Sequence, residues 1–100
     1  MTTVAVDAYV IDVLLADLVG HDRRPSAFLV YLWLAVQAAR TRGRPVRVSY
    51  QELADRTGLS KSAVQAAVRV LERRRLVQRH RPSPTATPEY RVLRPWVRSR

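Results

Sequence analysis

Polar side chains of several hydrogen-bonding types recur at helical spacing between residues 60 and 74. At about 100° per residue, they gather in an arc of roughly 140°, and apolar residues fill the opposite side. Glutamine can read adenine, arginine or lysine can read guanine, serine suits several bases, and an alanine methyl fits against thymine. The base-reading candidates on this arc are Lys61, Ser62, Gln65, Ala66 and Arg69. A solvated face opposite an apolar stripe is the alternative interpretation.

Basic residues continue toward the C-terminus and are candidates for contacts with phosphates. The phosphate and wing candidates are Ser60, Arg73, Arg79, Arg81 and Arg91, and Arg94, Arg98 and Arg100 follow in a basic tail. For Arg73, Arg74 and Arg75 the alternative is that they only complement the negative end of a helix. Glu72, at the edge of the arc, is expected to hold Arg69 or Arg73.

Residue types that support catalysis or metal binding are scarce. The chain has no cysteine, and its only histidines are His21 and His80. We find no paired carboxylates, no nucleophile with a base and no glycine-rich phosphate loop. We therefore expect no enzyme activity, no catalytic residues, no metal and no cofactor.

The charge is large and unevenly distributed. The 100 residues carry a formal net charge of +10, yet residues 1–22 contain four Asp and no Lys or Arg. A 47% hydrophobic content is too apolar for a disordered basic tail, so a folded body with a polyanionic partner is expected. No signal peptide or membrane span is evident, and we expect a cytoplasmic, nucleoid-associated protein.

The elements that position the polar arc follow from capping and periodicity. Residues 25–41 are expected to form a central helix, and residues 46–48 a short strand. Ser49 caps a helix that ends at Thr57, Gly58 makes a turn, and Ser60 caps the helix that carries the arc. Residues 76–80 and 89–93 are expected to form strands around a proline-rich loop. The predicted fold class is mainly α with a small antiparallel β-wing (α+β).

This order of elements, with the residues around the turn, resembles a known family. Residues 53–64 read LADRTGLSKSAV and residues 68–77 read VRVLERRRLV. Over residues 25–95 the chain resembles the winged helix-turn-helix DNA-binding proteins of bacteria, in the MarR-like and GntR-like style. The resemblance implies that the helix after Gly58 enters the major groove and that the wing follows the phosphate backbone or minor groove. Arg75 stands where relatives usually have glycine, so its backbone is expected either to be strained or to end the helix differently.

An additional helix is expected over residues 7–19, with Asp7 as cap and Gly20 as the stop. Ile11, Leu14, Leu15 and Leu18 form one apolar stripe at 3.6-residue spacing, and the opposite side is also apolar. We divide the chain into residues 1–22, an acidic and apolar candidate dimerisation element, and residues 23–100, the winged domain with its basic tail. The predicted dimer interface consists of Tyr9, Ile11, Leu14, Leu15 and Leu18. The alternative is that this helix packs only across its own domain.

The central helix has two apolar stripes. Leu29, Leu32, Trp33, Val36 and Ala39 are predicted to form its main buried stripe, and Phe28, Tyr31 and Ala35 a second one. Trp33 is expected in the core rather than as a ligand-stacking residue.

The function predicted from these features is sequence-specific binding of double-stranded DNA by a small bacterial transcriptional regulator. We expect a repressor that acts as a homodimer on a palindromic site. A small-molecule effector would have to bind between the first helix and the winged domain, and no residue set identifies one. Two alternatives remain open: a plasmid or phage replication, partition or excision accessory protein, and a winged-helix protein-interaction module.

Overall fold

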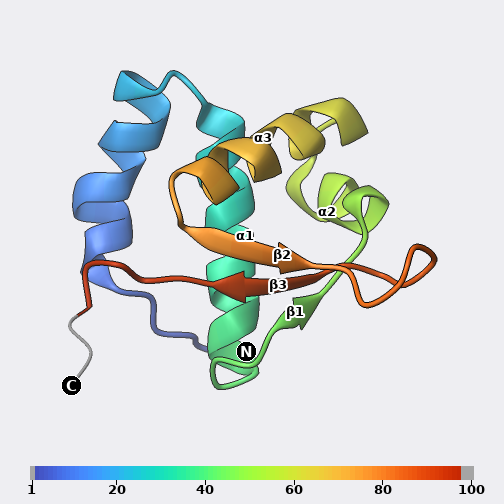
Figure 1. Ribbon diagram of the computed structural model, residues 1–100. Coiled ribbons are helices and arrows are strands. Elements are labelled where there is room, and N and C mark those ends of the chain that lie inside the picture. The colour runs from blue at the N-terminus through green and yellow to red at the C-terminus, as the bar shows by residue number, and fades with distance from the viewer. Residues whose placement is uncertain (1, 98–100) are drawn as a thin grey trace.

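The computed structural model describes residues 2–97, and its elements follow the predicted order of helix, helix, strand, helix, helix, strand, loop, strand (Figure 1). The N-terminal helix covers residues 8–21 and contains two π-helical segments, η1 (Val10–Leu14) and η2 (Asp17–His21). The remaining elements are α1 (Pro25–Arg40), β1 (Val46–Arg47), α2 (Tyr50–Thr57), α3 (Lys61–Arg73), β2 (Val77–His80) and β3 (Glu89–Val92). The predicted winged-helix architecture is confirmed. No helix among these residues is long and apolar enough to cross a membrane.

Two serine caps set the start of α2 and α3. The Ser49 hydroxyl oxygen accepts a hydrogen bond from the Glu52 backbone N–H at 3.0 Å, and that of Ser60 accepts one from the Ala63 N–H at 3.1 Å. Each cap satisfies a helix N–H group that has no partner within the helix. Between the two helices, Gly58 adopts a φ of 78°, which only glycine adopts without strain.

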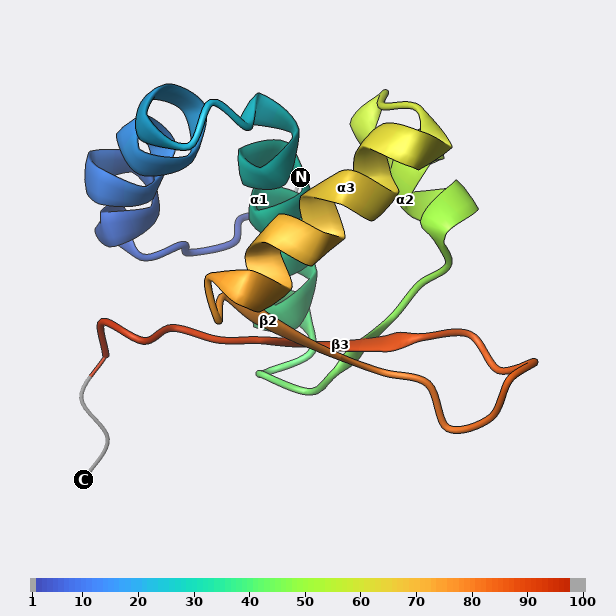
Figure 2. The same cartoon turned by 45° about the horizontal axis from the view of Figure 1, so that its top comes forward.

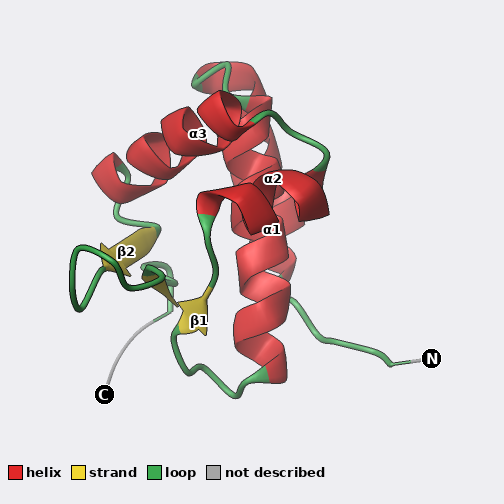
Figure 3. Cartoon of the chain, turned by 90° about the vertical axis from the view of Figure 1, so that its right-hand side faces the viewer, coloured by secondary structure: helices red, strands yellow, loops and turns green. Residues whose placement is uncertain are grey.

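The three strands form an antiparallel sheet in the order β1-β3-β2. Tyr90 of β3 lies between Val46 of β1 and Arg79 of β2, and its side chain is fully buried. Burial raises the pKa of the Tyr90 phenol, so it stays neutral in the core. Figure 3 shows the strands on one side of α1, with α2 and α3 crossing its upper half.

Helix α1 is the centre of a single core that all other helices and the sheet contact. Its fully buried side consists of Ala27, Phe28, Val30, Tyr31 and Leu34. The predicted main stripe is therefore wrong: Leu29 is 43% exposed, Ala39 is exposed, and Leu32, Trp33 and Val36 are half-buried. The reason is that α3 and the sheet pack on the side of α1 that carries Phe28 and Tyr31. The spacing of apolar residues within α1 does not indicate which of its two apolar sides will be covered.

The N-terminal helix lies on the opposite side of α1 from α2 (Figures 1 and 2). It buries Val10, Leu14 and Leu18 in the same core as the winged domain, so residue 22 does not separate two cores. Ile11 and Leu15 are 55% and 37% exposed, so the prediction that they share a face with Leu14 and Leu18 is wrong. In a π-helix each hydrogen bond joins residues i and i+5, so one turn contains more residues than in an α-helix. The pair Ile11 and Leu15 is therefore rotated away from the pair Leu14 and Leu18.

The predicted ends of this helix are also wrong. Gly20 does not stop it, because η2 continues through His21 and the Asp22 N–H donates to the Asp17 carbonyl oxygen at 2.8 Å. The Asp7 carboxylate does not cap it either. It accepts a hydrogen bond from the Trp96 indole N–H at 3.0 Å and lies 3.4 Å from the Arg94 guanidinium.

The segment after β3 holds the N-terminal helix against the body. Trp96 stacks on Tyr9, with ring centroids 4.4 Å apart, and meets the edge of Tyr31 at 6.4 Å. The Tyr31 hydroxyl donates to the Leu93 carbonyl oxygen at 2.9 Å. On the other side, Arg74 pairs with Asp17 at 2.7 Å and Asp22 at 3.2 Å. These contacts use three of the four N-terminal aspartates.

Candidate nucleic-acid interface

The polar arc lies on the outer side of α3. Lys61, Ser62 and Arg69 are exposed, and Gln65 and Ala66 are half-buried. The inner side is buried throughout and consists of Val64, Ala67, Val68, Val70 and Leu71. The predicted division of this helix into a buried apolar side and a polar outer side is confirmed. Its register is regular because α3 is an uninterrupted α-helix that starts at a serine cap.

Helix α2 supports α3 across the turn. Leu53 and Ala54 of α2 are buried, and the small Ala54 side chain lets the two helices approach closely. The Thr57 hydroxyl donates to the Leu53 carbonyl oxygen at 2.6 Å, and the Gly58 N–H donates to the Ala54 carbonyl oxygen at 2.9 Å. These two bonds close the end of α2, and with the Ser60 cap they help to fix the direction in which α3 starts.

The loop between β2 and β3 reaches the same side of the molecule as the first turn of α3 (Figure 2). Lys61 and Arg81 line one hollow of about 320 Å³, together with the N-terminal turn of α2 and the proline-rich loop. The fold thereby joins two predicted sets of residues into one surface. Its remaining lining residues are Ser49, Tyr50, Gln51, Pro84, Thr85, Ala86, Thr87 and Pro88.

Several of these lining residues were not predicted as site residues. Gln51 and Tyr50 belong to α2, and Thr85 and Thr87 belong to the loop. Nothing in their local sequence distinguishes them, because the two α2 residues and the two loop residues are more than thirty positions apart along the chain and meet only in the hollow. The hydrogen-bonding capacity of glutamine and threonine was the only available signal.

The wing is attached to α3 by a pair of charges. The Arg79 guanidinium lies 3.9 Å from the Glu72 carboxylate and 5.7 Å above the Tyr50 ring. The expectation that Glu72 holds Arg69 or Arg73 is therefore wrong, because β2 lies closer to it. Arg79 remains a phosphate candidate, but part of its charge is already neutralised.

The other phosphate candidates occupy different positions. Ser60 caps α3, and Arg73 is exposed at its last residue. Arg91 lies opposite Gln78, on the sheet face turned away from the buried Tyr90. Of the predicted basic tail, Arg94 instead pairs with Asp7, and Arg98 and Arg100 lie outside the described residues.

Arg75 begins the wing in a left-handed conformation, with a φ of 55°. Its N–H donates to the Glu72 carbonyl oxygen at 3.0 Å, and the Leu76 N–H donates to the Leu71 carbonyl oxygen at 2.9 Å. These two bonds are the Schellman arrangement that usually ends on glycine. Of the two expectations for this position, the strained backbone is the one observed, and the wing leaves α3 in the usual way.

The interface is electrostatically open to an anion. Among residues 2–97, Lys61, Arg69, Arg73, Arg81 and Arg91 form no ion pair with a carboxylate. Some arginines elsewhere are paired, as Arg74 is with Asp17 and Asp22 and Arg47 is with Glu89. Other arginines outside this surface, such as Arg40 and Arg44, also form no ion pair within residues 2–97, so the interface is defined by where its free basic groups gather with hydrogen-bonding side chains. The same described residues contain no group of three or more metal-ligating side chains.

Comparison with known proteins agrees with this geometry. A model of the MarR family matches residues 34–86, which span the second half of α1, α2, α3, β2 and most of the wing loop. No curated protein and no solved structure gave a match. The match covers more than half of the chain, and it includes both helices of the helix-turn-helix and the loop that lies beside them. The chain therefore belongs to the MarR family of winged helix-turn-helix proteins, and its role is DNA binding in transcription regulation.

Proposed function

We propose that this chain represses transcription by occupying a specific, two-fold symmetric DNA site as a homodimer. The observation that carries the proposal is the surface shared by the first turns of α3 and the wing loop. It combines hydrogen-bonding side chains with basic groups that lack a carboxylate partner among residues 2–97. Occupancy of a promoter is sufficient for repression, and the proposal needs neither a cofactor nor a catalytic step.

In this proposal, base reading belongs mainly to the N-terminal half of α3. Ser62 and Gln65 lie in its first two turns, Lys61 and Arg69 supply donors for guanine, and Ala66 contacts a thymine methyl. Phosphate contacts come from Ser60, Arg73, Arg79, Arg81 and Arg91. The helix cap places the Ser60 hydroxyl beside the free N–H groups of the first turn, where a phosphate is favoured.

The dimer contact in this proposal uses the exposed apolar residues of the N-terminal helix. Ile11 and Leu15 remain available from the predicted interface, and Tyr9 is 36% exposed although one face of its ring stacks on Trp96, whereas Leu14 and Leu18 are used by the chain's own core. Val13 and Val19, which are each 38% exposed, add to the apolar side chains that this helix leaves uncovered. Five large apolar side chains exposed on one short helix favour a contact with another apolar surface.

Selection of bound duplexes from a random pool tests the proposal directly. We expect enrichment of one sequence with two inverted half-sites, spaced by about one helical turn of 10 base pairs or a multiple of it. Binding should weaken with salt, the logarithm of the association constant falling with a slope of about −0.9 per phosphate neutralised. A pool that stays random, or an affinity that does not change with salt, would contradict sequence-specific DNA binding.

A matched pair of arginine variants locates the phosphate contacts. Arg81→Ala should weaken binding to all duplexes alike and reduce the magnitude of the salt slope by about 1. Arg44→Ala is the control, because Arg44 is an exposed arginine between α1 and β1. Figure 1 shows this connection at the end of α1 that lies away from α3. Equal effects of the two substitutions would exclude the wing as the source of the contacts.

A further inference from the structure

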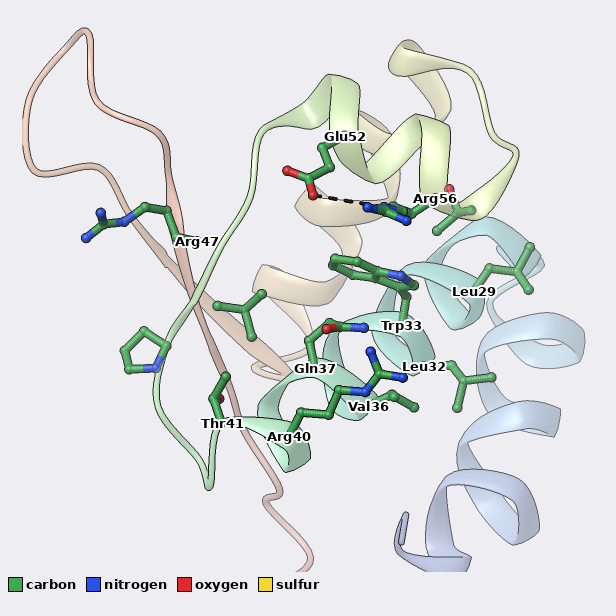
Figure 4. A pocket seen from close by; sticks show the side chains of 13 residues that line it. Leu29, Leu32, Trp33, Val36, Gln37, Arg40, Thr41, Arg47, Glu52 and Arg56 are labelled. Atoms are coloured by element: carbon green, nitrogen blue, oxygen red, sulfur yellow. Dashed lines mark ion pairs between the residues drawn. The ribbon is translucent and has the colours of Figure 1, made fainter. Parts of the chain in front are cut away.

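A groove lies on the side of α1 that faces away from α3, between α1, α2 and β1 (Figure 4). Its volume is about 770 Å³, and its floor consists of Leu29, Leu32, Trp33 and Val36. These residues were predicted to be buried, yet Leu29 is 43% exposed and the other three are half-buried. The groove is therefore an apolar strip of the central helix that the chain's own elements leave uncovered.

Charged side chains line the edges of this strip. In Figure 4 the Trp33 ring lies between Arg56 on one side and Gln37 and Arg40 on the other. Arg56 lies 4.0 Å from Glu52, and Arg47 is paired with Glu89 at 2.8 Å. Arg40 forms no ion pair among residues 2–97. The groove thus offers an apolar floor with one guanidinium that has no carboxylate partner in the described part of the chain.

The exposed surface of the N-terminal helix has the complementary composition. It carries Ile11, Val13, Leu15 and Val19, and residues 2–22 contain no lysine or arginine. Asp12 lies between the first two of these side chains, is exposed, and forms no ion pair within the described residues. Each surface therefore presents apolar side chains, and the unpaired charge is positive in the groove, at Arg40, and negative on the helix, at Asp12.

Charge also distinguishes two ways in which two copies could pair. If the N-terminal helices paired with each other through their exposed residues, the two copies of Asp12, which have no ion-pair partner within residues 2–97, would approach each other with no lysine or arginine on either helix to offset them, which is unfavourable. If the helix of one copy entered the groove of the other, Asp12 would approach arginines and the apolar residues would cover one another. The second arrangement removes both exposed apolar surfaces from water at once.

From this complementarity we propose that the groove receives the N-terminal helix of a second copy, in a reciprocal exchange with two-fold symmetry. The inference rests on the proposed homodimer and specifies its contact surfaces. Glu52, Arg56 and Thr57 of α2 also line the groove, so the contact reaches the helix that supports α3. The dimer contact would thereby fix the spacing of the two α3 helices on DNA.

Disulfide trapping tests this arrangement, because the chain has no cysteine of its own. Two full-length variants, Ile11→Cys and Val36→Cys, are made with different tags and oxidised alone and as a mixture. We expect the mixture to form Ile11–Val36 disulfides between copies, and each variant alone to form few. Arg69→Cys, on the proposed DNA-binding side of α3, is the control and should remain uncrosslinked with either.

The other patterns of trapping contradict the inference in distinguishable ways. Ile11–Ile11 disulfides as the main product would show helix-to-helix pairing, which overturns the groove contact and leaves the proposed homodimer intact. Val36–Val36 disulfides would show pairing of the two α1 grooves and would overturn it equally. Absence of all disulfides, with a monomer mass in light scattering, would remove the homodimer as well, while the duplex selection still reports on DNA binding.

Charge reversal provides a second, independent measurement. Asp12→Arg and Arg40→Asp should each weaken dimerisation about 3- to 10-fold, and the double variant should recover most of the loss. Both positions are exposed, so neither single substitution is expected to unfold the monomer. If the double variant loses as much dimer affinity as the two single variants lose together, Asp12 and Arg40 do not contact each other.

Discussion

The recognition helix α3 and the N-terminal helix respond differently to the same kind of sequence pattern. In α3 the residues at 3.6-residue spacing divide as expected into a buried side and an exposed side. In the N-terminal helix the four residues chosen by that spacing separate, because Leu14 and Leu18 are buried and Ile11 and Leu15 are exposed. Of these two helices, only the N-terminal helix contains π-helical segments.

The charges of the two helices differ in the same way. The basic residues on the outer side of α3 have no carboxylate partner within residues 2–97, which leaves them free for a polyanion. Three of the four aspartates in residues 1–22, namely Asp7, Asp17 and Asp22, are already bound by Arg74, Arg94 or Trp96. Charge in α3 is therefore available to an external partner, whereas charge in the N-terminal segment mostly fixes its helix to the chain's own domain.

The largest expected effect concerns the stability of the N-terminal helix, where buried and exposed residues should respond differently to substitution. Leu18→Ala should lower the free energy of unfolding by about 2–5 kcal/mol, because Leu18 is fully buried in the common core. Ile11→Ala, at a position that is 55% exposed, should change it by about 0.5 kcal/mol or less in the monomer. Denaturant titration at low protein concentration measures both, and similar losses would contradict the assignment of the two faces.

Gln65 gives the next largest effect, on binding rather than on folding. Gln65→Ala should cost about 1–3 kcal/mol on the selected duplex and relax base preference at one position of each half-site. Affinity for random duplexes should not change, since the substitution removes no positive charge. Equal loss on selected and random duplexes in a gel-shift titration would reject base reading by this side chain.

A substitution of Arg74 tests whether charge stabilises the contact between the N-terminal helix and the rest of the domain. Arg74→Met removes the pairs with Asp17 and Asp22, and we expect a loss of about 1 kcal/mol because all three side chains are partly exposed. The loss should shrink at high salt, since screening weakens the pair in the original protein. DNA affinity of the folded variant should fall no more than that of Arg44→Ala, and a larger fall would place Arg74 in the interface.

The smallest expected effect is on stability, at the arginine of positive φ that follows α3 and at the one that follows the N-terminal helix. Arg75 has a φ of 55° after α3 and Arg23 a φ of 54° after the N-terminal helix. Replacement of either by glycine should raise stability by about 0.5–1 kcal/mol, because glycine adopts this conformation without strain. Arg73→Gly, at the regular end of α3, is the control and should lower stability by about 0.5–1 kcal/mol. Loss of stability in Arg75→Gly would contradict the strained backbone.

Much of the winged domain could be predicted because its signals are local. Ser49 and Ser60 cap helices through bonds to residues three positions away, and Gly58 makes the turn with its own backbone. The strands around the proline-rich loop pair with each other directly. The side of α1 that is buried could not be predicted, because it has apolar residues on two sides and the choice between them depends on where α3 packs.

The candidate site could also be predicted only in part, as the hollow lined by Lys61 and Arg81 shows. The sequence identified both residues as basic and exposed, but they are twenty positions apart along the chain. Their proximity depends on the wing folding back past the first turn of α2, which also brings Tyr50 and Gln51 into the surface. The contact of Arg79 with Glu72 and Tyr50 arises from the same placement.

The sequence by itself determined the order of the elements, the serine caps of α2 and α3, the polar side of α3 and the family, since these depend on short stretches of the chain. Only the tertiary structure decided which residues of the N-terminal helix and α1 are buried, which arginines are paired, and where an apolar groove remains open. These outcomes depend on packing between segments distant in the chain, and a helix with apolar residues on two sides does not specify which side its neighbours will cover.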